Sequence, residues 1–281
     1  MATRTYDPAF SDEEATIVLT SSDDVNYRLH SFTLRTTSGF FRGMISLPQK
    51  PSGDDASKVG EDEQIALSEG SKVLGILFRI ISGLLVDKWG SLDEVKDILA
   101  AAQKYDMPGP ISAIRSVVTS PPRLQEQPLQ CYAIAARYDW EEEARIISTY
   151  TLNKCLHDEG NRYILEQVPS PYLLRLLRLH KSRRDKFKEH IIKGNKCFGI
   201  ESSHGCTDSC MALLGQFAQI LVSEMENHPG GDTLIAGSWK RWPIYGSQIV
   251  EDIKVGLNNL PTKIEVPAQV HTPSQVFTDD R

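Results

Sequence analysis

The hydrophobic pattern changes part-way along the first half of the chain. Residues Ala15 to Ser22 and Tyr27 to His30 are short and rich in β-branched or aromatic residues, and the turn-forming Asp23 to Asn26 separates them. This pattern predicts a β-hairpin. Ser31 to Thr36 and Ser38 to Ile45 then predict two short helices, so the fold opens with strands and continues with helices.

The segment Pro48 to Glu63 interrupts this first domain without ending it. It has almost no large apolar residue, so it cannot offset its own ordering entropy and is predicted to be a mobile loop. Gln64 to Ser68 then predicts a third strand. Apolar residues at helical spacing follow and predict three more helices, containing Val73 to Ile81, Leu92 to Ala102 and Ile111 to Val118, with Ser91 as a cap for the second. The fold class is therefore α+β.

The best domain boundary is the break at Ser120-Pro121-Pro122. Nearly all of the chain beyond it predicts helices, which we place at Leu129 to Tyr138, Glu141 to Leu152, Pro171 to Lys193, Thr207 to Asn227 and Ser247 to Leu257. We expect an N-terminal arm over residues 1–14, a first domain over 15–120, an all-α helical extension over 121–260 and a disordered tail over 261–281.

Composition and charge narrow the function classes. The chain has 40% hydrophobic and 24% charged residues and no apolar stretch long enough for a membrane span, which predicts a soluble protein with no membrane partner. Its net charge of −6 disfavours nucleic acid as a partner. Because the N-terminus lacks a secretory pattern, we expect a cytoplasmic or nuclear protein with reduced cysteines.

Two separate segments resemble the BTB (POZ) family. The run from Asn26 to Met44 is similar to the family signature of an aromatic residue, a hydrophobic-His pair, a helix with a Leu, and Ser-x-x-Phe. Ala101 to Met107 resembles the helix end that closes the family's domain. The resemblance implies a small β-sheet flanked by helices, and a non-enzymatic protein-interaction and dimerisation module, such as an adaptor or scaffold, with no cofactor.

Apolar residues of the two short helices are candidates for a homodimer interface. They exceed what a small three-stranded sheet can cover, and a two-fold BTB interface would bury them; they are Leu34, Phe40, Phe41 and Met44. We therefore expect the chain to pair with itself through the first domain. An unidentified protein is the expected partner of the helical extension.

More narrowly, the chain resembles the fungal BTB-domain proteins, in which a BTB domain continues into a helical region. The matching segments beyond the BTB signature are Ser46 to Gln49, Tyr105 to Met107, Tyr138 to Ala144 and Leu173 to His180. One position departs from the pattern of BTB adaptors that recruit cullin ubiquitin ligases. Where these have hydrophobic-x-Glu, this chain has Leu47-Pro48-Gln49, so the resemblance does not support cullin binding.

His30 is the most conspicuous candidate catalytic base, because a neutral imidazole suits proton transfer near neutral pH. No nucleophile with an orienting carboxylate accompanies it in a recognisable motif. Its place in the BTB pattern favours a buried, hydrogen-bonded structural histidine instead.

Two clusters in the helical extension keep other functions open. The basic run from Lys181 to Lys196 would suit a nucleic-acid-associated regulator, although acidic residues lie among its cations and favour a solvated helix face. The other alternative is a small zinc-dependent protein built on a cysteine cluster, with candidate ligands at Cys197, His204, Cys206 and Cys210. The expectation for these cysteines is unliganded thiols, because no second Cys pair completes four ligands.

Overall fold

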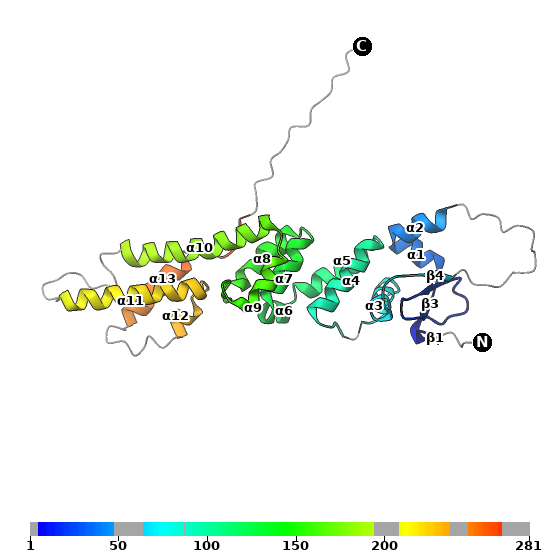
Figure 1. The fold of residues 1–281 in the computed structure, drawn as a ribbon, viewed down its shortest axis with the longest axis horizontal. Helices are drawn as coiled ribbons and strands as arrows, with labels where there is room; N and C mark the ends of the chain where they lie inside the picture. The colour runs from blue at the N-terminus through cyan, green and yellow to red at the C-terminus, as the bar shows by residue number, and fades with distance from the viewer. Residues whose placement is uncertain (1–4, 48–63, 87, 194–207, 237–246, 266–281) are drawn as a thin grey trace, which may run out of the picture. The chain divides into compact units, whose positions relative to one another are not determined.

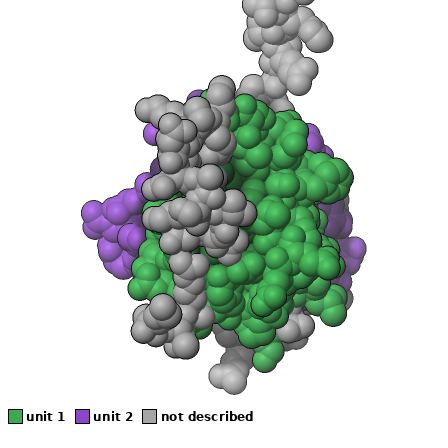
Figure 2. Space-filling model, turned by 90° about the vertical axis from the view of Figure 1, so that its right-hand side faces the viewer, with its two compact units in different colours: residues 1–120 green, residues 121–281 purple. Residues whose placement is uncertain are grey.

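The computed structural model describes residues 5–47, 64–86, 88–193, 208–236 and 247–265, and divides the chain into two compact units. Unit 1 comprises residues 1–120 and unit 2 residues 121–281, coloured separately in Figure 2. The division coincides with the Ser120-Pro121-Pro122 break. The described residues are mixed α+β, 66% helical with a small four-stranded sheet, as the hydrophobic pattern predicts.

Unit 1 holds all four strands of the described part of the chain (Figure 1). They are β1 (Thr5–Tyr6), β2 (Ile17–Thr20), β3 (Val25–Leu29) and β4 (Gln64–Ala66), in the order β1-β3-β2-β4. The antiparallel β2–β3 pairing, with Leu19 opposite Tyr27, confirms the predicted hairpin. β1 pairs in parallel with β3, so the segment expected to be an arm joins the sheet. The predicted loop at 48–63 lies outside the described residues.

Five α-helices and one 3₁₀ turn complete the described residues of unit 1. The turn is η1 (Pro8–Phe10), and the helices are α1 (Ser31–Thr37), α2 (Gly39–Ser46), α3 (Ser71–Ile81), α4 (Leu92–Lys104) and α5 (Pro108–Val118). Ser91 caps α4 in a reciprocal capping box with Glu94, as expected. The rings of Phe10, Tyr27 and Phe78 pack within 5.1–6.1 Å of one another and tie η1, the sheet and α3 into one core.

The hairpin turn also fastens α3. Both the backbone N–H and the hydroxyl of Ser71 donate to the Asp23 carboxylate, at 2.7 and 2.6 Å. These hydrogen bonds lower the pKa of Asp23 to about 2, so the carboxylate stays charged at neutral pH. Asp24, the next residue, adopts a left-handed φ of 62°, which aspartate tolerates better than most residues.

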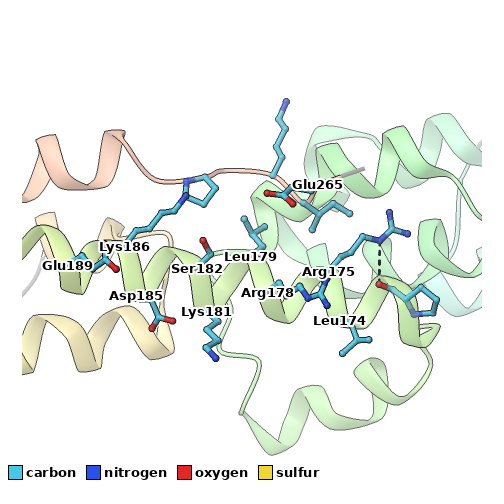
Figure 3. A pocket seen from close by; sticks show the side chains of 14 residues that line it. Leu174, Arg175, Arg178, Leu179, Lys181, Ser182, Asp185, Lys186, Glu189 and Glu265 are labelled. Carbon is cyan, nitrogen blue, oxygen red and sulfur yellow. Dashed lines mark hydrogen bonds between the residues drawn. The ribbon is translucent and has the colours of Figure 1, made fainter. Parts of the chain in front are cut away.

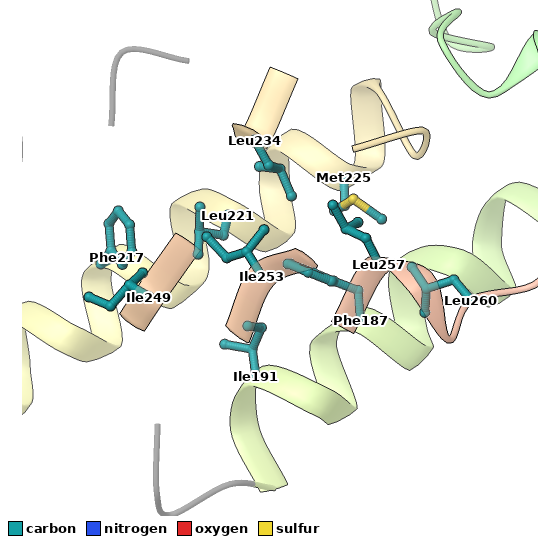
Figure 4. Packing of buried hydrophobic residues seen from close by; sticks show 10 residues of the cluster. All are labelled: Phe187, Ile191, Phe217, Leu221, Met225, Leu234, Ile249, Ile253, Leu257 and Leu260. Carbon is teal, nitrogen blue, oxygen red and sulfur yellow. The ribbon is translucent and has the colours of Figure 1, made fainter. Parts of the chain in front are cut away.

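Unit 2 is built from helices throughout its described part. They are α6 (Pro121–Glu126), α7 (Pro128–Arg137), α8 (Glu141–Thr151), α9 (Glu159–Glu166), α10 (Ser170–Lys193), α11 (Asp208–Asn227), α12 (Asp232–Ala236) and α13 (Ser247–Asn258). α10, α11, α12 and α13 share an apolar core, which Figure 4 shows around Phe187, Leu221 and Ile253. In the described ranges, no helix combines the length and apolarity that crossing a bilayer requires.

The end of unit 2 differs from the expected tail. Leu260 and Ile264 are 6% and 3% exposed, so the chain belongs to the folded unit as far as Glu265. The backbone N–H of Ile264 donates to the Ser148 hydroxyl at 3.1 Å, and the carbonyl of Pro261 accepts from Arg183 at 2.8 Å. The short apolar positions here have no periodicity, so the pattern alone could not separate them from a tail.

Candidate functional site

The two segments that carry the BTB resemblance meet in unit 1. The Ser38 hydroxyl donates to the carbonyl of Tyr105 at 2.5 Å and accepts from the backbone N–H of Phe41 at 3.1 Å, which caps α2. The backbone N–H of Gly39 donates to the Asp106 carbonyl at 2.9 Å. The end of α4 therefore fixes the start of α2 through segments 67 residues apart, and we call this contact the motif junction.

An aromatic stack fills the motif junction. The Phe41 and Tyr105 rings stack at 5.3 Å, and Phe40 lies edge-on to both at 5.2 and 5.4 Å. The Tyr105 hydroxyl donates to the Glu69 carboxylate, which also pairs with Lys104 at 2.7 Å. Burial first, and then this hydrogen bond, raise the pKa of Tyr105, so it remains a protonated donor.

Only part of the predicted dimer interface is accessible. Leu34 and Phe41 are fully buried within unit 1, whereas Phe40 is 45% exposed and Met44 half-buried. The sequence-based argument assumed that the sheet could not cover these side chains, but Tyr105, which follows α4, stacks on Phe41. Leu34 and Phe41 therefore cannot contact a partner while this packing persists.

Sequence reasoning left the two most exposed apolar residues of α1, α2 and their caps out of the predicted dimer interface. Phe32 is 76% exposed and Leu47 66% exposed. Phe32 lies two residues before Leu34, and two residues rotate an α-helix by about 200°, so burial of Leu34 places Phe32 on the opposite face. This helical spacing was the signal in the sequence that could have predicted an exposed Phe32.

His30 is not the buried histidine that the sequence suggested. Its side chain is 54% exposed, and Nε2 lies 3.7 Å from the Asp12 carboxylate. It precedes α1 in extended conformation, makes no side-chain capping bond, and follows Tyr27 and Leu29, whose side chains point into the core. Alternation along the strand turns His30 outward.

Most of the candidate zinc ligands lie outside the residues that the structure describes. Cys197, His204 and Cys206 are not among the described residues, and Cys210 lies in α11 with its side chain outside them. Within the described ranges, no group of three or more His, Cys, Asp and Glu residues could hold a metal. The thiols of Cys131 and Cys155 are free. Gln49 is also outside the described residues, so the cullin and zinc hypotheses remain predictions.

The basic run on α10 does not present its cations on one exposed face. Arg183 is 4% exposed, and its guanidinium donates to the carbonyls of Pro229 and Pro261, at 2.6 and 2.8 Å. Arg184 bonds Asp185 and also Glu226, each at 2.8 Å. Two of the cations that a nucleic-acid interface would use are therefore engaged within unit 2.

A groove of about 890 Å³ runs along α10 and residues 261–265 of unit 2 (Figure 3). The lining side chains of α10 form two adjacent stripes at helical spacing, Leu174-Arg178-Lys181-Asp185 and Arg175-Leu179-Ser182-Lys186. Leu179 and Lys186 extend toward the segment that carries Glu265. Arg175 donates twice to the Glu141 carboxylate, at 2.9 and 2.7 Å, which anchors this end of the groove to α8.

These two features, the motif junction and the α10 groove, are the candidate functional sites. No protein-family model matches the chain, and no curated protein matches it either. The proposals below are therefore argued from the geometry of the two sites.

Proposed function

We propose that the chain is a non-enzymatic protein-interaction subunit, in which unit 1 is a BTB-type domain that forms a homodimer and unit 2 binds a partner protein. The observation that carries this proposal is the motif junction. Ser38, Phe41 and Tyr105 come from the two segments that resemble the BTB signature, and they bond and stack with one another. A chance likeness in two short segments would give no reason for them to meet.

The order of elements in unit 1 supports the same proposal. A β-hairpin leads into the paired helices α1 and α2, and a later strand and three helices complete the domain. The expected family fold is a small sheet flanked by helices, and unit 1 has this composition. The titratable groups at the junction serve the fold: Glu69 accepts from Tyr105 and Lys104, and its pKa is lowered because these hydrogen bonds outweigh the effect of burial.

The accessible apolar side chains of α1 and α2 define the dimer surface in this proposal. Phe32, Phe40 and Leu47 are each at least 45% exposed, and Met44 is half-buried beside them in sequence. Large exposed aromatic residues contribute most to interfaces when a partner desolvates them. A two-fold contact would bury the same residues on both copies.

The wild-type protein is expected to be a dimer at tens of micromolar, measured by light scattering coupled to size exclusion. Phe32→Asp should weaken dimerisation by about a hundredfold or more, because it replaces an apolar anchor with a charge that must be desolvated. The variant should keep its circular dichroism spectrum, since Phe32 is 76% exposed within one chain.

Leu85→Asp is the matched control. Leu85 is also strongly exposed, at 83%, but follows α3 rather than belonging to α1 or α2. It should leave the dimer intact. A monomeric wild-type protein would contradict the proposal, and a dimeric Phe32→Asp variant would contradict the choice of surface.

We further propose that the chain does not recruit a cullin through the usual BTB contact, because Gln49 lacks the charge of the family's glutamate. Charge-assisted hydrogen bonds are about twice as strong as neutral ones. Gln49→Glu is therefore expected to raise any residual cullin binding severalfold in a purified pull-down. Tight binding by the wild-type chain would refute this prediction.

A further inference from the structure

We propose that the α10 groove of unit 2 binds an acidic peptide segment that carries an apolar anchor, supplied by a partner protein. This inference rests on the proposed function, because it assigns a chemical class to the partner of unit 2. It is carried by the unpaired cations of the groove, its fixed walls and its exposed apolar position.

Four of the five cations that line the groove are free to meet a ligand, and only Arg175 is paired, with Glu141. Among the described residues, Arg178, Lys181, Lys186 and Lys263 take part in no ion pair, and all four are exposed. The protein as a whole is acidic, with 37 acidic and 31 basic residues, so this concentration of free positive charge is a local feature. Complementary charge on a ligand would speed association and fix its register.

The walls of the groove are already in place. Arg183 holds Pro261 against α10 from the buried side, and Ile264 is bonded to Ser148 on α8. Residues 261–265 therefore form a fixed edge rather than a free end. A preformed groove costs a ligand less ordering free energy than a mobile surface does.

The exposed leucine of the first stripe supplies the apolar contact. Leu174 is 53% exposed and lies one turn before Arg178 and two turns before Lys181. At a rise of about 1.5 Å per residue, the apolar contact and the second cation are about 10 Å apart. A short peptide with a leucine or aromatic anchor and acids within the next two turns fits this spacing.

Acidic residues in the same groove favour a peptide over a polyanion. Asp185, Glu189 and Glu265 line it together with the cations, and would repel the continuous negative charge of a nucleic acid. A peptide can place neutral or basic residues opposite them. Mixed charge with an apolar anchor is therefore the chemistry that this groove recognises.

The test is selection of a phage-displayed library of random 12-residue peptides on the full-length protein. Enriched peptides should be acidic and contain a leucine, isoleucine or aromatic residue. A fluorescein-labelled enriched peptide should then lose at least tenfold in affinity, by fluorescence anisotropy, when Arg178 and Lys181 are both changed to glutamate. Replacing its acids with the corresponding amides should have a similar effect.

Lys188→Glu is the matched control, because Lys188 is exposed on α10 but does not line the groove. It should retain the affinity of the wild type. Leu174→Ser provides a second, uncharged variant, with an expected severalfold loss. Circular dichroism and light scattering on the same samples separate a failure of the groove from misfolding and from a failure of dimerisation.

Three results would overturn the assignment. The first is an enriched set without acidic residues, or unchanged binding by the double variant. The second is tighter binding of a fluorescein-labelled 20-base-pair duplex DNA, lost in the same variant, which would make the occupant a nucleic acid. The third is displacement of the enriched peptide by a synthetic peptide of residues 266–281, or by a second copy of the protein, which would make the occupant this chain itself.

Discussion

Replacing Arg183 with methionine is expected to lower the free energy of unfolding of unit 2 by about 3–5 kcal/mol, measured by urea denaturation. Arg183 is 4% exposed, and its guanidinium donates to three carbonyls, those of Pro229, Pro261 and Gly230. Methionine keeps the apolar stem but has no donor. Each carbonyl left buried without a partner costs about 1–3 kcal/mol.

The three carbonyls belong to two segments that are far apart in the sequence. Pro229 and Gly230 form the turn between α11 and α12, and Pro261 follows α13. Arg183 therefore holds both segments against α10. Burial lowers its pKa, but arginine remains charged at neutral pH, so the charge is compensated by carbonyl dipoles rather than by a contacting carboxylate.

Arg184→Met is the control for the Arg183 prediction, because it makes the same chemical change at the next residue. Arg184 bonds Asp185 and Glu226 near the surface, where ion pairs contribute about 1 kcal/mol or less. Arg183→Lys should fall between the two, since an ammonium cannot span three carbonyls as a planar fork does. Equal losses for the Arg183 and Arg184 methionine variants would show that the buried hydrogen bonds do not hold the unit together.

The sequence contained the signal for an inward Arg183, although the basic run concealed it. Leu176, His180, Arg183 and Phe187 recur at helical spacing, and all four are buried. The run of cations suggested one solvated or nucleic-acid-facing surface because charge was counted along the chain rather than around the helix. The helical periodicity therefore predicts the burial of Arg183 better than the local composition does.

Local patterns predicted the β2–β3 hairpin and most helices because a turn or a repeat of apolar residues encodes each of them within a few positions. β1 escaped prediction because Thr5 and Tyr6 form a strand only by pairing with Val25 and Asn26. The motif junction was likewise visible only as two separate segments. A contact between residues 67 positions apart in the sequence produces no periodic pattern in either segment.

Burial of particular side chains was the least predictable property. Phe40 and Phe41 are adjacent and identical, yet one is 45% exposed and the other fully buried. The difference depends on Tyr105, which arrives from α4 and stacks on Phe41. His30 was misassigned because its place in the BTB pattern was preferred to the strand alternation, which turns it outward from the buried Tyr27 and Leu29.

Lowering the pH from 7 to 5 is expected to destabilise unit 2 through His180. Its side chain is 9% exposed, and Nε2 lies 3.2 Å from the hydroxyl of Thr151. Burial lowers the pKa of His180 to about 3, and the positive charges of Arg183 and His157 act in the same direction. In the unfolded chain the pKa returns to about 6.5, so the unfolded state binds more protons below that pH.

The sign follows from this difference in proton binding. Below pH 6.5 the unfolded state binds a proton that the folded state does not bind. The free energy of unfolding therefore falls as the pH decreases, down to the folded-state pKa of about 3. Between pH 7 and pH 5 the single site accounts for about 2 kcal/mol, because each pKa unit corresponds to about 1.36 kcal/mol. Carboxylates that lose ion pairs also contribute in acid, so the site must be isolated by comparison with a variant.

His180→Gln supplies that comparison. Glutamine can keep a hydrogen bond to Thr151 but does not titrate, so the variant should lose about 2 kcal/mol less than the wild type between pH 7 and pH 5 in urea unfolding experiments. His30→Gln is the matched control in unit 1, where the side chain is 54% exposed. Parallel pH profiles for wild type and His180→Gln would mean that His180 is protonated in the folded protein, and hence that α10 does not bury it against α8.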